Sequence, residues 1–366
     1  MIPLFRPYIC KEARDNVLRV LDSGWIGLGP EVEEFEKEFA SYTGAKYAVA
    51  FSSCTGALET AVACLNGVKS VAITTPNTFI STNHVLLHQG YEILFADINP
   101  TTGQMDLDSV ECLLHEINPG LIMAVHYGGQ PLDIDRLYKF GVDVIEDCAH
   151  ACGATYKGRK VGSDSRLACF SFNAVKNLPT GDGGMLVTSE KWIADKAKQL
   201  RWLGIDKSTA DRVKEGGYSW EYDVPELGYK SHMNDITAAI GRGQLGRVDL
   251  DNKRRKELVD LYRKGLAGCE MVQLLTQSPD SQSSNHLMVV RCKERERVMQ
   301  ALKENDVQFG CHYKPNYLYP MYRGFERENG CKGMEEFSHQ ALTLPLHLFL
   351  RDCDVDRICK VIQGVN

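Results

Sequence analysis

Short apolar runs alternate with amphipathic stretches over the first two-thirds of the chain. The runs are five to eight residues long, and most are rich in β-branched or aromatic residues, which is typical of buried strands in a mainly parallel sheet. The predicted strands are 46–53, 70–75, 91–98, 120–127, 142–148, 167–172 and 184–188, and the predicted helices between them are 55–66, 79–88, 107–116 and 132–139. This alternation predicts an α/β domain with its ligand outside the carboxyl ends of the strands.

The pattern changes after residue 234. Residues 235–268 predict one long helix, and the pattern also allows a break near Gly241 and Gly243. The basic run of this helix at 253–256 is expected to be a solvated face. Beyond it the sequence predicts a strand at 286–291, a helix at 294–304, a strand at 307–313, an irregular loop at 314–333 and two further helices. We therefore expect a large domain over residues 1–245 and a smaller α+β domain over 246–366.

Length, charge and hydropathy exclude several classes of protein. The 366 residues suffice for roughly two domains, and the net charge of −6 argues against nucleic acid or an anionic membrane as a partner. No apolar stretch reaches the length of about 18 residues that a membrane span needs, and residues 1–17 lack the layout of a signal peptide, so a cytoplasmic location is expected.

The thirteen cysteines predict neither disulfides nor a metal site. They include no C-x-x-C pair, and the ligand spacing of structural zinc is missing. We expect reduced, buried side chains, for example at Cys64, Cys112, Cys169 and Cys359.

Three features at strand ends or tight turns carry candidate chemistry. Asp147 closes an apolar strand, and His150 follows it. Lys176 lies five residues after Ser171, next to the glycine-rich turn GDGG, where a desolvated amine could form a Schiff base. In SSCTGALETA (52–61), a strand leads into a helix whose first N–H groups and hydroxyls could bind phosphate.

Each feature also has a plain structural explanation: a hydrogen-bonded acid–imidazole pair, a surface lysine and a helix cap. Together they fit one ligand, pyridoxal 5′-phosphate. Its phosphate would be held by Thr55 and Ser171, its pyridine nitrogen would pair with Asp147, and its aldehyde would react with Lys176. Lys176 would then also move protons as general base and acid.

Many ordered blocks of the chain resemble one family, the DegT/DnrJ/EryC1/StrS nucleotide-sugar aminotransferases, which are fold-type I pyridoxal-phosphate enzymes. They are DSGWIGLGPEVEEFEKEFA (22–40), SSCTGAL (52–58), TPNTFISTNHVLLHQG (75–90), FADINPTTGQMD (95–106), VHYGGQPLDID (125–135), VIEDCAHACGA (144–154), SFNAVKNLPTGDGG (171–184), ELGYKSHMNDITAAIGRGQL (226–245) and HYKPNY (312–317). The resemblance implies a large domain with a mainly parallel mixed sheet flanked by helices, and a smaller α+β domain after it.

The resemblance also implies roles for individual residues. Lys176 matches the lysine that forms the internal aldimine, Asp147 the acid at the pyridine nitrogen, and His150 the Gln or His near the ring hydroxyl. The other cofactor contacts implied are the stacking ring of Phe79, the hydroxyls of Thr55 and Ser171, and the backbone at Cys54. Substrate contacts are expected at Ile26, Gly27, His312, Tyr313, Lys314 and Tyr317.

Two subunits share each active site in this family, so a homodimer is expected. Residues 1–30 would lie near its interface, and segments 25–30 and 228–233 would reach the neighbouring chain. Departures from the family pattern affect these contacts: Lys230 stands where many members have an Asn that reaches the partner's cofactor, and His232 or Asn234 could replace it. Cys54 replaces a frequent Gly, and Asn173 a frequent His or Tyr.

The implied reaction is a transamination. L-Glutamate would convert the cofactor to pyridoxamine 5′-phosphate, which would aminate a nucleotide-linked keto sugar, at C4 of a dTDP- or UDP-4-keto-6-deoxyhexose. The alternatives are a 3-keto-sugar aminotransferase, another fold-type I enzyme such as an amino-acid aminotransferase or β-eliminase, and a non-catalytic regulator. Lys176 favours transamination over the related dehydratases, which have His at this position.

Overall fold

A seven-stranded sheet forms the centre of the molecule. The computed structural model describes residues 1–65, 71–207, 221–325 and 330–365. The strands are β1 (Tyr47–Phe51), β2 (Val71–Thr74), β3 (Glu92–Phe95), β4 (Leu121–Val125), β5 (Val144–Asp147), β8 (Ala168–Ser171) and β9 (Gly184–Thr188), in the order β1-β9-β8-β5-β4-β2-β3. Only β9 runs antiparallel to its neighbours, which confirms the expected mainly parallel mixed sheet.

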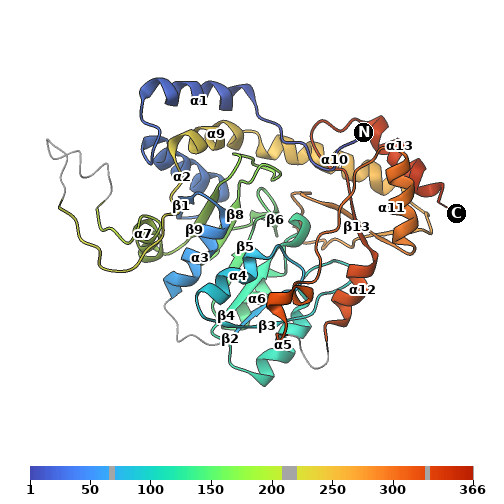
Figure 1. The fold of residues 1–366 in the computed structure, drawn as a ribbon, viewed down its shortest axis with the longest axis horizontal. Helices are drawn as coiled ribbons and strands as arrows, with labels where there is room; N and C mark the ends of the chain where they lie inside the picture. Colours follow the sequence, from blue (N-terminus) through green and yellow to red (C-terminus); the bar gives the residue numbers. More distant parts are fainter. Residues whose placement is uncertain (66–70, 208–220, 326–329, 366) are drawn as a thin grey trace.

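Helices cover both faces of this sheet (Figure 1). They are α2 (Pro30–Thr43), α3 (Cys54–Leu65), α4 (Ser81–His88), α5 (Leu107–Glu116), α6 (Ile134–Lys139) and α7 (Lys191–Leu200), whereas α1 (Lys11–Ser23) packs on α9 (Asp235–Leu245). Alternate strand residues enter different cores: Val49 packs with α3, whereas Ala48 and Ala50 pack with α2. Two buried faces explain why the strands read as nearly continuous apolar runs.

The C-terminal part has its own sheet and core. Strands β10 (Val272–Leu274), β12 (Met288–Cys292) and β13 (Ala341–Leu344) pair antiparallel, with helices α10 (Val248–Gly265), α11 (Arg295–Glu304), α12 (Lys332–Gln340) and α13 (Asp352–Gln363) around them. Helix α9 packs instead on α1 and α2. A small sheet joins β11 (Ser281–Gln282) to β6 (Thr155–Tyr156) and β7 (Arg159–Lys160). Short 3-10 turns span Tyr127–Gly129, Asn316–Leu318 and Pro320–Tyr322. The division of the chain at 245–250 stays a prediction.

The first residues of the chain pack into this C-terminal core. Ile2 is buried there, and it pairs with Val307 in an isolated parallel bridge. The Ile2 N–H donates to the carbonyl of Asp306 (2.7 Å), and the Ile2 carbonyl accepts from Gln308 (2.9 Å). The N-terminal strand-like segment is therefore held by residues about three hundred positions away.

Several predictions about the C-terminal part are wrong. The long helix breaks at 246–247, not at the earlier glycines, because these glycines serve helix packing: a Cβ would lie 2.5 Å from Phe35 at Gly241 and 2.5 Å from Ala13 at Gly243. The predicted strand 307–313 forms only isolated bridges, and the third strand of the sheet is instead 341–344.

Two side-chain predictions are also wrong. Arg255 is buried rather than solvated, and it donates to the carbonyl of Leu346 (3.1 Å). Cys112 lies on the exposed face of α5. Cys64, Cys169 and Cys359 are buried thiols, as expected. In the described ranges, we find no helix with the length and apolar character that a membrane crossing requires.

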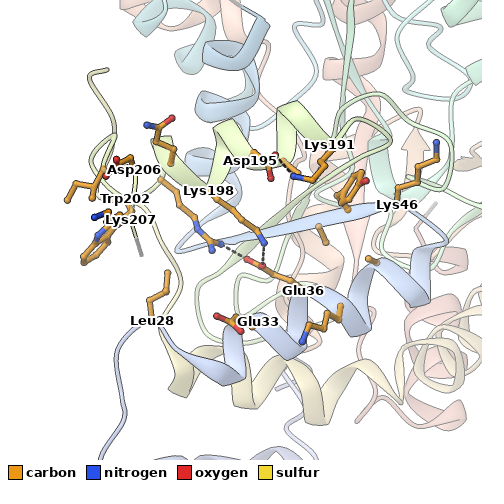
Figure 2. Close-up of a pocket in the computed structure, with 18 residues that line it drawn as sticks. Leu28, Glu33, Glu36, Lys46, Lys191, Asp195, Lys198, Trp202, Asp206 and Lys207 are labelled. Carbon is orange, nitrogen blue, oxygen red and sulfur yellow. Dashed lines mark hydrogen bonds and ion pairs between the residues drawn. The ribbon is translucent and has the colours of Figure 1, made fainter. Parts of the chain in front are cut away.

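A buried ion pair occupies the open edge of β1 (Figure 2). Glu36 accepts a hydrogen bond from the Ala50 N–H (2.9 Å), and Arg201 donates to both Glu36 and the Ala50 carbonyl. Both charged side chains are about 95% buried. The pair thus takes the place of a neighbouring strand at Ala50, which limits edge-to-edge association.

The substitution Arg201→Ala is expected to lower the free energy of unfolding by about 3–5 kcal/mol, because it leaves the Glu36 carboxylate buried with a reduced set of partners. Urea unfolding monitored by circular dichroism measures the loss. The matched control is Lys198→Ala, because Lys198 contacts the same carboxylate (3.3 Å) with a half-exposed side chain. The control should cost about 1 kcal/mol or less. Equal losses in the two variants would contradict the assignment.

Candidate active site

A cavity of about 410 Å³ lies at the carboxyl edge of the large sheet, next to the ends of β5 and β8. Nine of the residues predicted from the sequence line it: Cys54, Thr55, Phe79, Asp147, His150, Ser171, Lys176, His312 and Tyr313. Seven of them come from the α/β part, and the last two come from the loop after α11. The fold therefore assembles the predicted groups at the place where parallel sheets bind ligands.

The Lys176 amine is desolvated within this cavity. Burial lowers the pKa of Lys176 from 10.5 to about 8, and the nearby Asp147 charge opposes part of this effect. The backbone is held by a turn in which the Lys176 N–H donates to the carbonyl of Asn173 (2.9 Å). A larger fraction of the amine is thus neutral at physiological pH than for an exposed lysine, which favours attack on an aldehyde.

Asp147 faces the same cavity from the end of β5. Its Oδ2 accepts from the Thr82 hydroxyl (2.7 Å), and its Oδ1 accepts from the Ala149 N–H (2.9 Å). Burial raises the pKa of Asp147, while these two hydrogen bonds and the Lys176 charge favour the carboxylate. A protonated ring nitrogen beside it would do the same, because an opposite charge stabilises the ionised form.

Glu146 points to the opposite face of β5, as the alternation of strand side chains predicts. Its carboxylate contacts His126 (2.9 Å) and accepts from the hydroxyls of Tyr138 and Ser165 (2.6 Å each). His126, Glu146 and Cys148 could in principle hold a metal ion. However, Glu146 and the backbone N–H of Leu132 occupy both ring nitrogens of His126, so we assign these residues to packing behind β5.

The start of α3 forms the end of the cavity suited to an anion. The first N–H groups of a helix have no intrahelical acceptor, and its dipole favours negative charge. Ser53 precedes the helix and accepts from the Gly56 N–H (3.1 Å), and Thr55 and Ser171 line the cavity beside it. The loop is packed closely, because a Cβ at Gly184 would lie 2.5 Å from the backbone of Ser53.

His150 and Tyr313 form a hydrogen-bonded pair in the lining of the cavity. The His150 Nδ1 accepts from the Gly128 N–H (3.2 Å), so its Nε2 carries the proton and donates to the Tyr313 hydroxyl (3.1 Å). The Tyr313 proton is then available for donation. Phe79 is 59% exposed, and its ring lies 6.3 Å from the ring of Tyr313.

These groups fit pyridoxal phosphate on structural grounds. A desolvated amine, a buried carboxylate and a helix start with flanking hydroxyls line one cavity. They match the aldehyde, the ring nitrogen and the phosphate of this cofactor. The exposed face of Phe79 is free to stack on a ring.

The remaining predicted site residues lie outside this cavity. The amine of Lys230 lies 3.6 Å from the ring centroid of Trp202, and the His232 ring packs edge-on against the same indole (4.4 Å). The Lys314 amine lies over Tyr319 (4.6 Å), and Tyr317 is buried against Phe95. Ile26 and Gly27 are exposed, and Asn234 caps α9 by accepting from Thr237. Substrate contacts are also expected from the loop 202–225, of which residues 208–220 lie outside the described residues.

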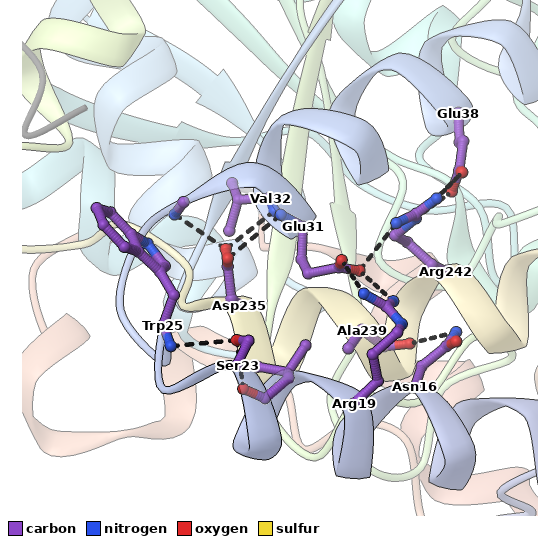
Figure 3. A network of polar contacts seen from close by, with 12 residues as sticks. Asn16, Arg19, Ser23, Trp25, Glu31, Val32, Glu38, Asp235, Ala239 and Arg242 are labelled. Atoms are coloured by element: carbon purple, nitrogen blue, oxygen red, sulfur yellow. Dashed lines mark hydrogen bonds and ion pairs between the residues drawn. The ribbon is translucent and has the colours of Figure 1, made fainter. Parts of the chain in front are cut away.

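A hydrogen-bonded network fixes the loop that carries Ile26 and Gly27 (Figure 3). Asp235, at the start of α9, accepts from the N–H groups of Gly29 (2.9 Å), Val32 (3.1 Å) and Glu31 (3.3 Å). Its own N–H donates to the Gly27 carbonyl (2.7 Å). A residue about two hundred positions away thus caps α2 and sets the course of the loop before it.

A second and larger cavity, of about 710 Å³, lies along the edge of β1 between α2 and α7 (Figure 2). Its lining includes Lys46, Lys191 and Lys198, and Trp202 lies at one end. None of the chemical groups predicted for the cofactor lines it, whereas the smaller cavity is lined by Lys176, Asp147 and Thr55.

Residues that were not predicted from the sequence support the predicted groups. Thr82 bonds Asp147 from 65 positions away, and Asn77 accepts from the Tyr313 N–H (3.1 Å) across 236 positions. Hydroxyl and amide residues are frequent in the segment 74–83, which overlaps a block that resembles the family, but neither signal names their partners. Their partners could be found only from the fold.

Neutral histidines near the cavity predict a pH dependence of stability. Burial lowers the pKa of His150 and His286 well below 6.5, and that of His312 to about 4. Below pH 6.5 the unfolded chain binds protons that the folded protein excludes, so the free energy of unfolding should fall as the pH drops from 7 to 5. Each histidine contributes at most about 1.4 kcal/mol per pH unit. Urea unfolding at pH 7, 6 and 5 tests this, and constant stability would contradict it.

The chain is similar to known aminotransferases in sequence and in fold. The profile of the DegT/DnrJ/EryC1/StrS aminotransferase family matches residues 7–363. The spore coat polysaccharide biosynthesis protein SpsC of Bacillus subtilis (strain 168) is 36% identical over 381 residues, which cover 100% of this chain and 97% of SpsC. The crystal structure of the sugar aminotransferase CalS13 from Micromonospora echinospora superposes with a TM-score of 0.91 at 29% identity, covering 100% of both chains. Spr1654 from Streptococcus pneumoniae, solved in its PMP form, gives 0.92 at 31% identity, covering 100% of this chain and 99% of its own.

Proposed function

Because the chain belongs to the DegT/DnrJ/EryC1/StrS aminotransferase family, we propose that it transfers the amino group of L-glutamate to a nucleotide-linked keto sugar. The enzyme is a pyridoxal-phosphate-dependent sugar aminotransferase of fold type I. The observation that carries the proposal is the single cavity in which Lys176, Asp147 and the start of α3 lie together.

Some residues of the cavity would bind the cofactor, and Lys176 would also transfer protons. When bound, pyridoxal phosphate supplies an electron-accepting ring. We assign the phosphate to Thr55, Ser171 and the backbone at Cys54, and the ring nitrogen to the Asp147 carboxylate. Lys176, with a pKa of about 8, can take up and return a proton at its Nζ near neutral pH.

Further contacts complete the proposed site. Phe79 offers its exposed face to the cofactor ring, and His150 donates through Nε2 to Tyr313, which leaves the Tyr313 proton for an oxygen of the substrate or cofactor. His312, from the same loop as Tyr313, lines the cavity and would contact the sugar.

We place the amination at C4 of a dTDP- or UDP-4-keto-6-deoxyhexose. Support comes from the segment 226–245, which resembles members that act at C4 more than members that act at C3. The test supplies L-glutamate with either 4-keto or 3-keto sugar nucleotides, measures 2-oxoglutarate, and locates the new amine by NMR. Amination of the 3-keto compounds alone would favour the 3-keto alternative. Absence of 2-oxoglutarate with every acceptor would favour the regulator.

Exposed apolar side chains support a homodimer. Leu18 (61% exposed) and Leu21 (50%) lie on α1, and Trp25 (39%) and Ile26 (51%) follow in the next loop. We propose that this surface meets a second copy, and that segments 25–30 and 228–233, with Ile26, Gly27, Lys230 and His232, contact the partner's site. A cytoplasmic location is part of the proposal, since thiols stay reduced there and nine of the thirteen cysteines are buried as thiols.

Asp235→Ala is expected to weaken the dimer, because the loop 24–29 loses the carboxylate that fixes it. Loss of the α2 cap alone should cost about 1–2 kcal/mol of stability. Sedimentation equilibrium measures the dissociation constant. The control is Asp106→Ala, which removes the cap of α5 and should lower stability without affecting association. Equal dissociation constants in the Asp235 variant and the wild type would contradict the role of this loop.

A further inference from the structure

A segment of the C-terminal part crosses over to the large sheet just before β12. The Ser284 N–H donates to the Gly129 carbonyl (3.1 Å), and the His286 N–H donates to the Gly128 carbonyl (3.1 Å). The approach is close, because Gly129 has φ +91° and a Cβ there would lie 2.2 Å from the Ser284 hydroxyl. Residues 284–286 are all buried, and none of them lines the cavity itself.

His286 makes a directed hydrogen bond to the residue after the Schiff-base lysine. The side-chain amide of Asn177 donates to the Asn252 Oδ1 (2.7 Å) and to the Ser284 carbonyl (2.8 Å). Its Oδ1 is therefore an acceptor, and the contact to the His286 Nδ1 (3.0 Å) requires that this nitrogen carry the proton. Asn177 is thus held on both ends of its amide by groups outside its own loop.

The same imidazole packs on His150. The two ring centroids are 4.4 Å apart with an interplanar angle of 32°. The Ser284 hydroxyl donates to the His150 carbonyl (2.5 Å), so ring and backbone of His150 are both in contact with the segment. His286 is 2% exposed, and burial keeps its pKa well below the ordinary value, so the ring is neutral in both contacts.

We propose that His286 is a positioning residue that fixes His150 and the Lys176 turn relative to each other. It touches neither the cavity nor the reacting atoms, and it acts through Asn177 on one side and His150 on the other. The inference rests on the proposed function, because it takes Lys176 as the lysine that reacts with the cofactor. On this proposal, a residue of the C-terminal part of the chain aligns His150 with the turn that carries Lys176.

Two substitutions separate the ring from the hydrogen bond. His286→Asn keeps an N–H donor near the position of Nδ1 and removes the ring, whereas His286→Phe keeps a ring and removes the donor. We expect the phenylalanine variant to lower kcat by about tenfold to a hundredfold with a much smaller change in KM for L-glutamate. The asparagine variant should retain the Lys176 turn and recover part of kcat.

The deciding readout is the pKa of the Lys176 amine in the cofactor-free, full-length protein, measured by competitive acetylation and mass spectrometry. The wild-type value is expected near 8. Loosening the turn admits water, so the value should rise toward 10.5 in His286→Phe and stay near 8 in His286→Asn. This readout does not depend on the identity of the amino donor or the sugar, so failure of the positioning role and failure of the proposed function are distinguishable.

The control is Asp97→Asn, which weakens another contact between the two parts of the chain, the capping of α12 at Gly333 (2.8 Å) and Met334 (2.9 Å). It should lower stability and leave the Lys176 pKa unchanged. If His286→Phe does not fold, Asn177→Ala is measured instead, with the same expected rise. An unchanged Lys176 pKa in the folded variant overturns the proposal, as does an equal rise in the Asp97 control.

Discussion

Replacement of Lys176 by alanine is expected to abolish transamination, with a loss of turnover of at least about 10⁴-fold. The substitution removes one amine that serves both as the nucleophile and as the proton carrier. The wild-type protein should be yellow with bound pyridoxal phosphate, and its visible band should shift when L-glutamate is added. In the variant the band should be altered or lost. Absorption spectra and production of 2-oxoglutarate measure both effects.

The matched control for this variant is Lys196→Ala. Lys196, on α7, is another largely buried lysine. Its Nζ lies 3.5 Å from a carboxylate oxygen of Glu226, and it does not line the cavity. The control should retain both the visible band and turnover. A wild-type protein that stays colourless in the presence of pyridoxal phosphate would contradict the proposal and favour the non-catalytic regulator.

Asp147→Asn should give the second-largest loss. The substitution keeps the shape of the side chain but removes the charge that would stabilise a protonated ring nitrogen. Loss of one partner of a buried charge pair costs about 2–5 kcal/mol, which corresponds to a decrease in kcat of about thirtyfold to several thousandfold. Steady-state kinetics with L-glutamate and a keto-sugar nucleotide measure the decrease.

The neighbouring carboxylate supplies the comparison for this experiment. Glu146→Gln changes a buried acid on the opposite face of β5, where it contacts His126, Tyr138 and Ser165. We expect lower stability and an unchanged absorption spectrum of the bound cofactor. The role assigned to Asp147 would be wrong if its variant kept full kcat while the Glu146 variant lost it.

The local sequence pattern was sufficient to predict the place of a side chain where that place depends only on the helix or strand that carries it. The alternation of side chains along β5 separates Asp147 from Glu146, and the join between β1 and α3 identifies Cys54 and Thr55 as residues at a helix start. The pairing of His150 with Tyr313 joins residues 163 positions apart, and no local period reports it. The resemblance to a family supplied those residues, and the fold supplied the contact between them.

The errors in the C-terminal part have physical causes. Residues 307–313 have a strand-like pattern, but their backbone makes only bridges to Ile2 and Thr343 before the chain turns to line the cavity. The short run 341–344 completes the sheet because it meets β12, which local propensity does not encode. At Gly241 and Gly243 a missing side chain allows helices to approach, whereas the sequence alone suggested a break.

The burial of Ile2 among residues 258–362 has a consequence for synthesis of the protein. A ribosome makes residues 2–4 long before Asp306, Gln308 and Leu346, the residues to which their backbone is hydrogen-bonded. The α/β part can collapse first, as N-terminal units do during translation. Ile2 then stays uncovered until the residues that bury it, 258–362, have been made. A chain interrupted before residue 307 would therefore expose an apolar N-terminal segment to which chaperones could bind.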